Sequence, residues 1–149
     1  MIRNRIYLDN CCFNRPYDDQ SNLNVHLEAE AKLFIQSEIL NNTFELIWSF
    51  MMDYEILSNP FNDRQVAFLK WKNIAVVDID PIEEILIKGK ILNQKNIKRK
   101  DALHIACAIK AECEYFLTTD IKVLKKDIPE IKLINPIDFV RRFFQEGEL

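Results

Sequence analysis

Acidic side chains follow two apolar segments of the sequence, at points where strands are expected to end. Asp9 comes directly after an apolar run, and Asp120 follows another near the end of the chain. In a parallel sheet both residues lie at the same edge. Two more acids, Asp101 and Glu55, could reach that edge from a helix start or an inward helix face. We therefore expect a cluster of four carboxylates.

Clustered carboxylates repel one another unless cations neutralise them. A site with oxygen ligands alone favours Mg²⁺ or Mn²⁺ over zinc or copper. Such ions activate water and stabilise the charge that develops during phosphodiester hydrolysis, so metal-dependent cleavage of a phosphodiester is the chemistry this set would perform. An acid after a strand is also a common helix N-cap, and that interpretation stays open for each position.

The apolar pattern predicts the elements that must position these acids. Strands are expected over Arg5 to Leu8, Phe44 to Trp48, Ala75 to Ile79, Tyr115 to Thr118 and Lys132 to Ile134. Between them, helical spacing predicts helices that include Leu27 to Ile39, a segment N-capped by Ser49, Asn62 to Lys72, Pro81 to Leu92, Arg99 to Glu112 and Pro136 to Phe144. Strands separated by helices favour a mostly parallel sheet covered on both faces, a three-layer α/β/α sandwich.

Composition and length suit one globular domain over residues 1–149, because 48% of the residues are hydrophobic and 29% are charged. The segment Met1 to Leu8 is interrupted by charges and fits neither a signal peptide nor a membrane span, so a cytoplasmic protein is expected. The four cysteines show no metal-binding spacing, and we expect them to be reduced and buried. With only 2 glycines, Gly-rich phosphate loops are excluded.

Three short motifs resemble those of PIN-domain nucleases. Ile6-Tyr7-Leu8-Asp9-Asn10 with Phe13-Asn14-Arg15-Pro16 resembles the first motif, and Leu117-Thr118-Thr119-Asp120 resembles the fourth. The segment Lys100-Asp101-Ala102-Leu103-His104-Ile105-Ala106 is similar to the third motif and is the most specific of these matches. The span from the first motif to the last covers nearly the whole chain, and the motifs come in the usual order. The resemblance implies a PIN-like fold.

The same resemblance implies roles for single residues. Asp9, Glu55, Asp101 and Asp120 would be the catalytic acids and metal ligands, with Thr118 and Asn10 in support. Asp53 competes with Glu55 as the acid of the second motif, but Glu55 shares a helical side with Met52 and Ile56, whereas Asp53 does not. Other residues near these acids have two interpretations. His104 could donate to a phosphate or orient a carboxylate, but it is expected to be a satisfied, partly buried histidine. Asp18 and Asp19 could border the cleft, but they are expected to be solvated or capping. The aromatic residues Phe34, Phe44, Trp48, Phe68 and Trp71 are expected in the core.

A basic segment runs directly into Asp101. Although the net charge is -3, the stretch from Lys88 to Lys100 holds six Lys or Arg residues and no acid. Lys98, Arg99 and Lys100 are the residues expected to bind RNA phosphates beside the metal centre. The alternative interpretation is a solvated helix face and loop.

The first functional hypothesis is an endoribonuclease dependent on Mg²⁺ or Mn²⁺. The short chain resembles VapC-type toxins, which implies an antitoxin protein as a partner and leaves a homodimer open. The second hypothesis is a non-catalytic PIN-like module that binds RNA or protein. A haloacid-dehalogenase-type phosphatase is disfavoured because Cys11 stands where a second Asp would be needed.

Overall fold

The computed structural model describes residues 4–146, so Met1 to Arg3 of the expected charged N-terminal segment and the C-terminal Gly147 to Leu149 lie outside the described residues. Its centre is a five-stranded, all-parallel sheet in the order β3-β2-β1-β4-β5. The strands are β1 (Asn4–Leu8), β2 (Phe44–Ser49), β3 (Val77–Ile79), β4 (Tyr115–Leu117) and β5 (Lys132–Ile134). Within the described residues no helix is long and apolar enough to cross a membrane.

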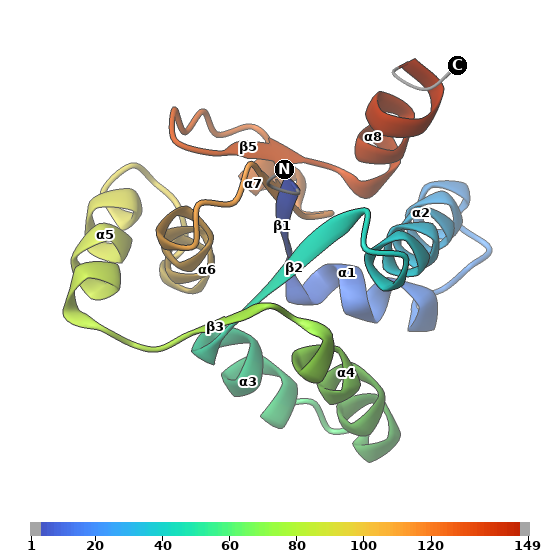
Figure 1. Cartoon of the computed structure of the whole chain (residues 1–149), viewed down its shortest axis with the longest axis horizontal. Coiled ribbons are helices and arrows are strands. Elements are labelled where there is room, and N and C mark those ends of the chain that lie inside the picture. Colours follow the sequence, from blue (N-terminus) through green and yellow to red (C-terminus); the bar gives the residue numbers. More distant parts are fainter. Residues whose placement is uncertain (1–3, 147–149) are drawn as a thin grey trace.

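Helices connect the strands in the predicted alternation. They are α1 (Asn10–Asn14), α2 (Leu23–Leu40), α3 (Phe50–Leu57), α4 (Asn62–Ile74), α5 (Glu83–Asn93), α6 (Arg99–Lys110), α7 (Ile121–Leu124) and α8 (Pro136–Val140). A 3₁₀ turn, η1 (Arg15–Tyr17), follows α1, and a π-helical segment, η2 (Arg141–Glu146), follows α8. Figure 1 shows α5 and α6 on one side of the sheet and α2 with α8 on the other. The α/β sandwich and its parallel sheet are therefore confirmed.

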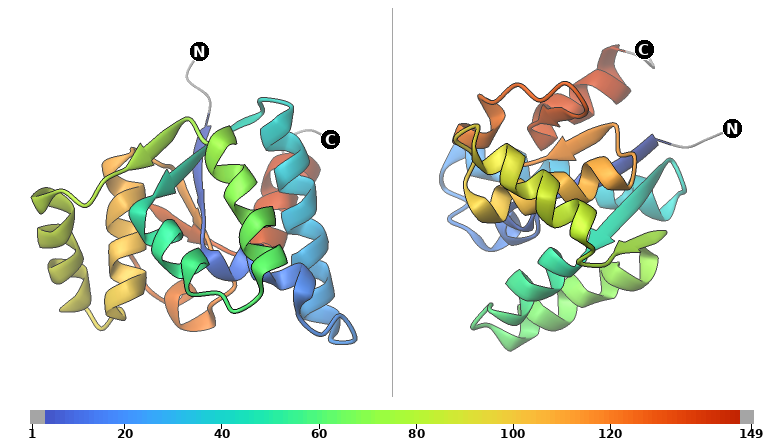
Figure 2. Two further views of the ribbon diagram at one scale, coloured as in Figure 1. Left: turned by 90° about the horizontal axis from the view of Figure 1, so that it is seen from below. Right: turned by 90° about the vertical axis from the view of Figure 1, so that its left-hand side faces the viewer.

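Strand β1 lies in the middle of the sheet, where both of its faces are covered. Its last three residues, Ile6 to Leu8, suit this position because they are apolar on both faces, and they are at most 1% exposed. Ile6 pairs with Leu46 of β2 on one side and with Tyr115 of β4 on the other. All strands run in one direction, so the residues after β1, β2 and β4 share one edge. The left view of Figure 2 shows β1 running between the helices on the two sides of the sheet and leading into α1.

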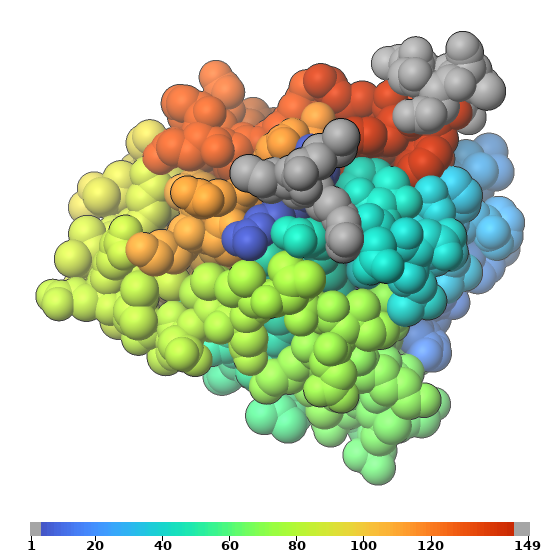
Figure 3. All heavy atoms as spheres, in the orientation of Figure 1, coloured from blue at the N-terminus to red at the C-terminus, as the bar shows by residue number. Residues whose placement is uncertain are grey.

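Helix α6 packs between the sheet and helix α5. Helix α6 is almost entirely enclosed, since α5 covers its outer side, and Gly89 of α5 permits this contact: a Cβ there would stand 2.8 Å from Cδ2 of Leu103. In the space-filling view α5 forms one flank of the molecule and α2 the opposite flank (Figure 3). Asp101 therefore sits at the start of a helix that is fixed from both sides.

The prediction for the buried face of α2 was partly wrong. Ala31, Ile35 and Ile39 are buried, but Leu27 is 44% exposed and Phe34 is 41% exposed. The buried stripe instead includes Glu28 and Lys32. Glu28 can be buried because Arg15 and Asn135 satisfy its two carboxylate oxygens, a pairing that apolar periodicity does not reveal. Of the other expected core aromatics, Phe44, Trp48 and Phe68 are buried and Trp71 is partly buried.

Several boundaries also differ from the sequence-based expectation. Pro81 does not open α5; the helix begins at Glu83, because Ile82 is extended and its amide bonds the carbonyl of Asp80 at 2.8 Å. Ser49 occupies the N-cap position of α3, but its side chain does not cap the helix. Strand β3 is shorter than predicted. The short helices α1 and α7 were not predicted, since four or five residues carry no periodic signal.

Candidate metal and nucleic-acid site

One pocket at the carboxyl edge of the sheet gathers the predicted acids. This cavity of about 590 Å³, the carboxylate pocket, is lined by Asp9, Asn10, Cys11, Asn14, Asp18, Glu55, Lys98, Arg99, Lys100, Asp101 and Asp120. Residues more than 100 positions apart thus meet because β1 and β4 are neighbours and α3 and α6 begin or pass at the same edge. The four predicted acids, a fifth acid, Asp18, which was expected to be solvated or capping, and three basic groups therefore face one space.

Asp9 is fixed by backbone and side-chain donors at the end of β1. Its Oδ1 accepts the amide of Asn10 at 2.8 Å, so it does cap α1. Its Oδ2 accepts the hydroxyl of Thr118 at 2.9 Å and lies 3.5 Å from Sγ of Cys11. The same Thr118 hydroxyl receives the amide of Asp120 at 3.2 Å. The capping interpretation and the pocket interpretation therefore both hold for Asp9, and Thr118 links the ends of β1 and β4.

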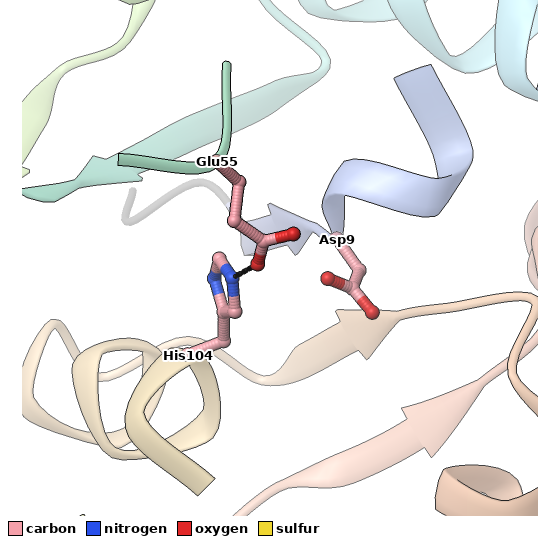
Figure 4. A group of neighbouring side chains, drawn as sticks. All are labelled: Asp9, Glu55 and His104. Atoms are coloured by element: carbon pink, nitrogen blue, oxygen red, sulfur yellow. Dashed lines mark hydrogen bonds and ion pairs between the residues drawn. The ribbon is translucent and has the colours of Figure 1, made fainter. Parts of the chain in front are cut away.

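Glu55 points toward Asp9 from α3 and is held by two partners. Asn10 donates its side-chain amide to Glu55 Oε2 at 3.2 Å, and Nε2 of His104 bonds Oε1 (Figure 4). Burial raises the pKa of Glu55, but the hydrogen bonds and charge of His104 outweigh this and keep that pKa below its ordinary value. Because the carboxylate carries no proton at neutral pH, Nε2 of His104 must be the donor. Glu55 is thus an anion held in one orientation.

His104 belongs to a buried hydrogen-bond chain rather than to the open pocket. It is 0% exposed, not partly buried as predicted. Its Nδ1 lies 2.6 Å from the hydroxyl of Tyr7, which in turn lies 2.6 Å from Oγ of Ser49. Burial lowers the pKa of His104, but the hydrogen bond to Glu55 and the charge of Asp9 raise it overall. Both ring nitrogens are therefore engaged, and the residue positions Glu55.

The competing acid of α3 faces a different partner. Asp53 accepts the indole N–H of Trp48 at 3.0 Å and an ammonium hydrogen of Lys72 at 3.1 Å. It does not line the carboxylate pocket, whereas Glu55 does. Asp53 and Glu55 therefore lie on different sides of α3, as their positions on a helix predict.

Asp101 and Asp120 complete the pocket from the start of α6 and the end of β4. Burial and the charges of Asp9 and Asp120 raise the pKa of Asp101 to about 6, so its ionised form is disfavoured in the metal-free protein. Asp120 also caps α7 by accepting the amide of Lys122 at 2.9 Å. Burial and the repulsion expected from the sequence therefore act together on Asp101.

The distances between these groups are uneven. Among residues 4–146, the only set of three acidic, His or Cys side chains with ligand atoms all within 4.8 Å of one another is Asp9, Glu55 and His104. Since both nitrogens of His104 are already hydrogen-bonded, we regard the oxygens of Asp9 and Glu55 as the ligands of that set. Asp101 and Asp120 line the same pocket but do not belong to this set. The all-oxygen donor set suits Mg²⁺ or Mn²⁺.

The basic side chains sit at the rim, where only part of the predicted segment contributes. Lys98, Arg99 and Lys100 line the carboxylate pocket, and the Lys100 ammonium lies 5.5 Å from the ring centroid of Tyr54. Lys88, by contrast, pairs with Glu130 outside this pocket.

Cys11, expected to be buried, is only partly buried, whereas Cys12, Cys107 and Cys113 are buried, and all four thiols are free.

Tyr7 and Ser49 were not anticipated as parts of the site. Both lie in strands whose apolar residues predict only a place in the hydrophobic core. The hydroxyl of Tyr7 could have indicated this contact, because a tyrosine in a strand buried on both faces needs a hydrogen-bond partner. His104 was a candidate partner, since the sequence has only 2 histidines.

Comparison with solved structures shows which known fold has this arrangement. One match is a chain of VapBC2 from Rickettsia felis bound to a DNA fragment from their promoter, with a TM-score of 0.55 and 17% identity over 88% of this chain and 98% of the other. Another is VapBC-1 from nontypeable Haemophilus influenzae, with a TM-score of 0.55 and 17% identity over 89% and 98% of the two chains. The chain has a PIN-domain fold.

This likeness lies in the fold alone, because identities of 17% leave the chemistry to the residues themselves. No protein-family model and no curated protein matches the sequence. The PIN-like arrangement of strands accounts for the placement of the four acids at one edge, which is where open parallel sheets bind their ligands.

Proposed function

We propose that this chain is a metal-dependent endoribonuclease that hydrolyses RNA phosphodiester bonds. The observation that carries the proposal is the carboxylate pocket, in which Asp9, Glu55, Asp101 and Asp120 face one space beside Lys98, Arg99 and Lys100. The four carboxylates would hold Mg²⁺ or Mn²⁺. When bound, such an ion supplies an activated water and stabilises negative charge at the scissile phosphate.

The protein side chains would divide the remaining work. Thr118 and Asn10 orient Asp9 and Glu55 through the hydrogen bonds described above. His104 keeps Glu55 ionised and in place from the buried side. The basic groups at the rim would hold phosphates that flank the one being cleaved, since Lys and Arg contacts to the backbone position a nucleic acid without reading its sequence.

We further propose that the chain, as one domain over residues 1–149, is the toxin of a toxin–antitoxin pair, with an antitoxin protein as its partner. The fold shared with VapBC proteins supports this role. The test is expression in a bacterial host alone and together with the product of a neighbouring small open reading frame. Growth arrest that the second protein relieves is the expected outcome, and unimpaired growth on expression alone contradicts the toxin role.

One observation favours the alternative of a non-catalytic RNA- or protein-binding module. Glu55 is already paired with His104 and Asn10, so part of the acidic set is neutralised without metal. The raised pKa of Asp101 argues the other way, because burial and the charges of Asp9 and Asp120 disfavour its ionised form and a bound cation would favour it.

Cleavage measurements separate the two functions. Asp101→Asn removes a charge and almost no volume, so it should abolish cleavage of single-stranded RNA in Mn²⁺ while circular dichroism and melting show an intact fold. Asp127→Asn, an exposed acid outside the pocket, is the matched control and should cleave like the wild type. Equal activity of wild type and Asp101→Asn would refute the assignment, and binding of RNA without any cleavage by wild type would favour the binding module.

A further inference from the structure

A second cavity opens beside the carboxylate pocket and shares a wall with it. This space of about 260 Å³, the lysine pocket, is lined by Asn96, Ile97, Lys98, Asp101, Asp120, Lys122, Val123, Lys125 and Lys126. Lys98, Asp101 and Asp120 border both cavities. If the phosphate to be cleaved lay beside Asp101 and Asp120, the adjacent nucleotide of the same strand would therefore lie in the lysine pocket.

The rim of the lysine pocket carries a concentrated positive charge. Lys122, Lys125 and Lys126 come from α7 and the two residues after it, and Lys98 faces them from the start of α6. Within residues 4–146 none of these four lysines forms an ion pair, in contrast to Lys88 and Lys72. Their ammonium groups are available for a negatively charged ligand. The capping bond from Lys122 N to Asp120 fixes α7, and with it these lysines, to the end of β4.

The floor of the lysine pocket is apolar. Ile97 is 4% exposed and Val123 is 3% exposed, and both line the cavity. A site with an apolar floor and a cationic rim suits a ligand that combines a flat, weakly polar ring with a phosphate. The volume lies just below the roughly 300 to 1,000 Å³ typical of pockets for small organic ligands, so it suits one nucleotide rather than a helix.

We propose that the lysine pocket is a binding subsite for one unpaired nucleotide of the RNA, adjacent to the phosphodiester in the carboxylate pocket. The base rests on Ile97 and Val123, and the flanking phosphate contacts the lysines. Bases in a duplex are paired and stacked and cannot enter such a cavity, so the subsite selects single-stranded RNA. This inference rests on the proposed function and adds a strand preference and a residue set that the basic segment at Lys98 to Lys100 does not supply.

The test is fluorescence anisotropy with a short labelled oligoribonucleotide in Mg²⁺, on a Glu55→Gln background that prevents cleavage and lies outside the lysine pocket. Lys122→Gln/Lys125→Gln is compared with Lys70→Gln/Lys132→Gln, which removes the same charge from exposed positions outside both pockets. The pocket variant should raise Kd for the single strand at least about tenfold. It should also reduce the log-log salt slope by about 1.4, or about 0.7 for each single-strand phosphate that a lysine no longer neutralises. The control should change both values much less.

Two further ligands make the outcome specific. The same strand annealed into a duplex should bind more weakly than the single strand, and a strand with abasic residues should lose affinity although its phosphates remain. Equal effects of the pocket and control variants, equal binding of duplex, or full binding of the abasic strand would each overturn the subsite. If neither the wild-type protein nor the background protein binds RNA, the proposed function itself fails, which is a distinct result.

Discussion

At the residue scale, the site combines acids that repel one another with a buried hydrogen-bond chain that fixes the orientation of one of them, Glu55. Asp101 carries most of the repulsion, and Glu55 carries most of the protein's own compensation through His104. The four acids could be predicted from sequence because each follows a strand or begins or lies within a helix near the same edge. The chain from Glu55 through His104 to Tyr7 and Ser49 could not, because it joins residues that have no common motif.

Burial of Asp101, together with repulsion from the neighbouring acids, predicts a stability effect in the absence of metal. Its folded-state pKa of about 6 lies above the unfolded value of about 3.9, so the native state holds the proton more tightly and the free energy of unfolding falls as pH rises between these values. At pH 7.5 in EDTA, Asp101→Asn should be more stable than wild type. We expect on the order of 1 kcal/mol, because solvent screens this half-buried group.

Thermal melting from pH 4 to 8 in EDTA measures this effect. The advantage of Asp101→Asn should grow through pH 6 and shrink when Mn²⁺ is added, while Asp127→Asn should follow the wild type throughout. A stability difference that does not depend on pH would show that the ionisation of Asp101 is not its cause.

The buried hydroxyl of Tyr7 predicts a separate effect on metal affinity. Tyr7→Phe keeps the ring stacked on Phe116 at 5.3 Å but leaves Nδ1 of His104 and Oγ of Ser49 without their shared partner. Loss of such a partner costs about 1 to 3 kcal/mol of stability. Because His104 then holds Glu55 less firmly, the Kd for Mn²⁺ should rise by about tenfold or more.

Titration calorimetry with Mn²⁺ tests this, and Tyr115→Phe is the control. Tyr115 is a buried strand tyrosine whose hydroxyl makes no hydrogen bond with residues 4–146. If Tyr7→Phe is destabilised but binds Mn²⁺ like the wild type, the chain stabilises the fold without positioning Glu55.

At the scale of the elements, the strands and long helices followed from periodicity, whereas the exceptions arose from polar pairs and local backbone geometry. Helix α2 shows why. Its apolar residues predicted a face through Leu27 and Phe34, yet tertiary pairing of Glu28 with Arg15 and Asn135 rotated the buried stripe. Helix α1 and helix α7 are too short for periodicity, and both are instead started by the site acids Asp9 and Asp120.

The rotated stripe of α2 buries Lys32, which predicts a pH-dependent stability. Burial lowers the pKa of Lys32 to about 8, and the side chain is 5% exposed. The unfolded state therefore binds more protons between pH 8 and about 10.4, so the Lys32 contribution to the free energy of unfolding rises with pH in that range. Lys32→Met should raise stability at pH 7 by about 1 to 2 kcal/mol, less than the full linkage value because the contact with Phe13 is altered.

Urea unfolding at pH 7 and pH 10 measures the effect as a difference between variant and wild type. The advantage of Lys32→Met should be smaller at pH 10, and Lys70→Met, at an exposed position of α4, should show no such change. A loss of stability in Lys32→Met at pH 7 would mean that the buried ammonium has a favourable partner.

At the scale of the whole molecule, an acidic protein places part of its positive charge where the proposed substrate would lie. The net charge of -3 argues against tight binding of nucleic acid over the whole surface. The basic groups of both pockets instead border Asp101 and Asp120. Sequence adjacency predicted Lys98 to Lys100 beside Asp101, whereas the lysines after Asp120 face Lys98 because α7 lies beside the start of α6.

This charge distribution predicts separate effects on binding and chemistry. Replacing Lys98, Arg99 and Lys100 with Gln should raise KM and flatten the salt dependence by about 0.7 units of log-log slope for each phosphate that is no longer neutralised, with little change in kcat. Rates measured from low to moderate salt decide the matter. An unchanged slope would identify a solvated face, and a collapse of kcat at saturating RNA would place these residues in the chemical step.

The most direct test of the carboxylate pocket as a metal centre is anomalous diffraction from a crystal of the wild-type protein soaked in Mn²⁺. We expect an anomalous peak between Asp9, Glu55, Asp101 and Asp120, with the oxygens of Asp101 and Asp120 drawn in toward it and His104 still bonded to Tyr7 and Glu55. Absence of Mn²⁺ from this pocket in a saturated crystal, or a peak coordinated elsewhere, would contradict the metal-dependent nuclease.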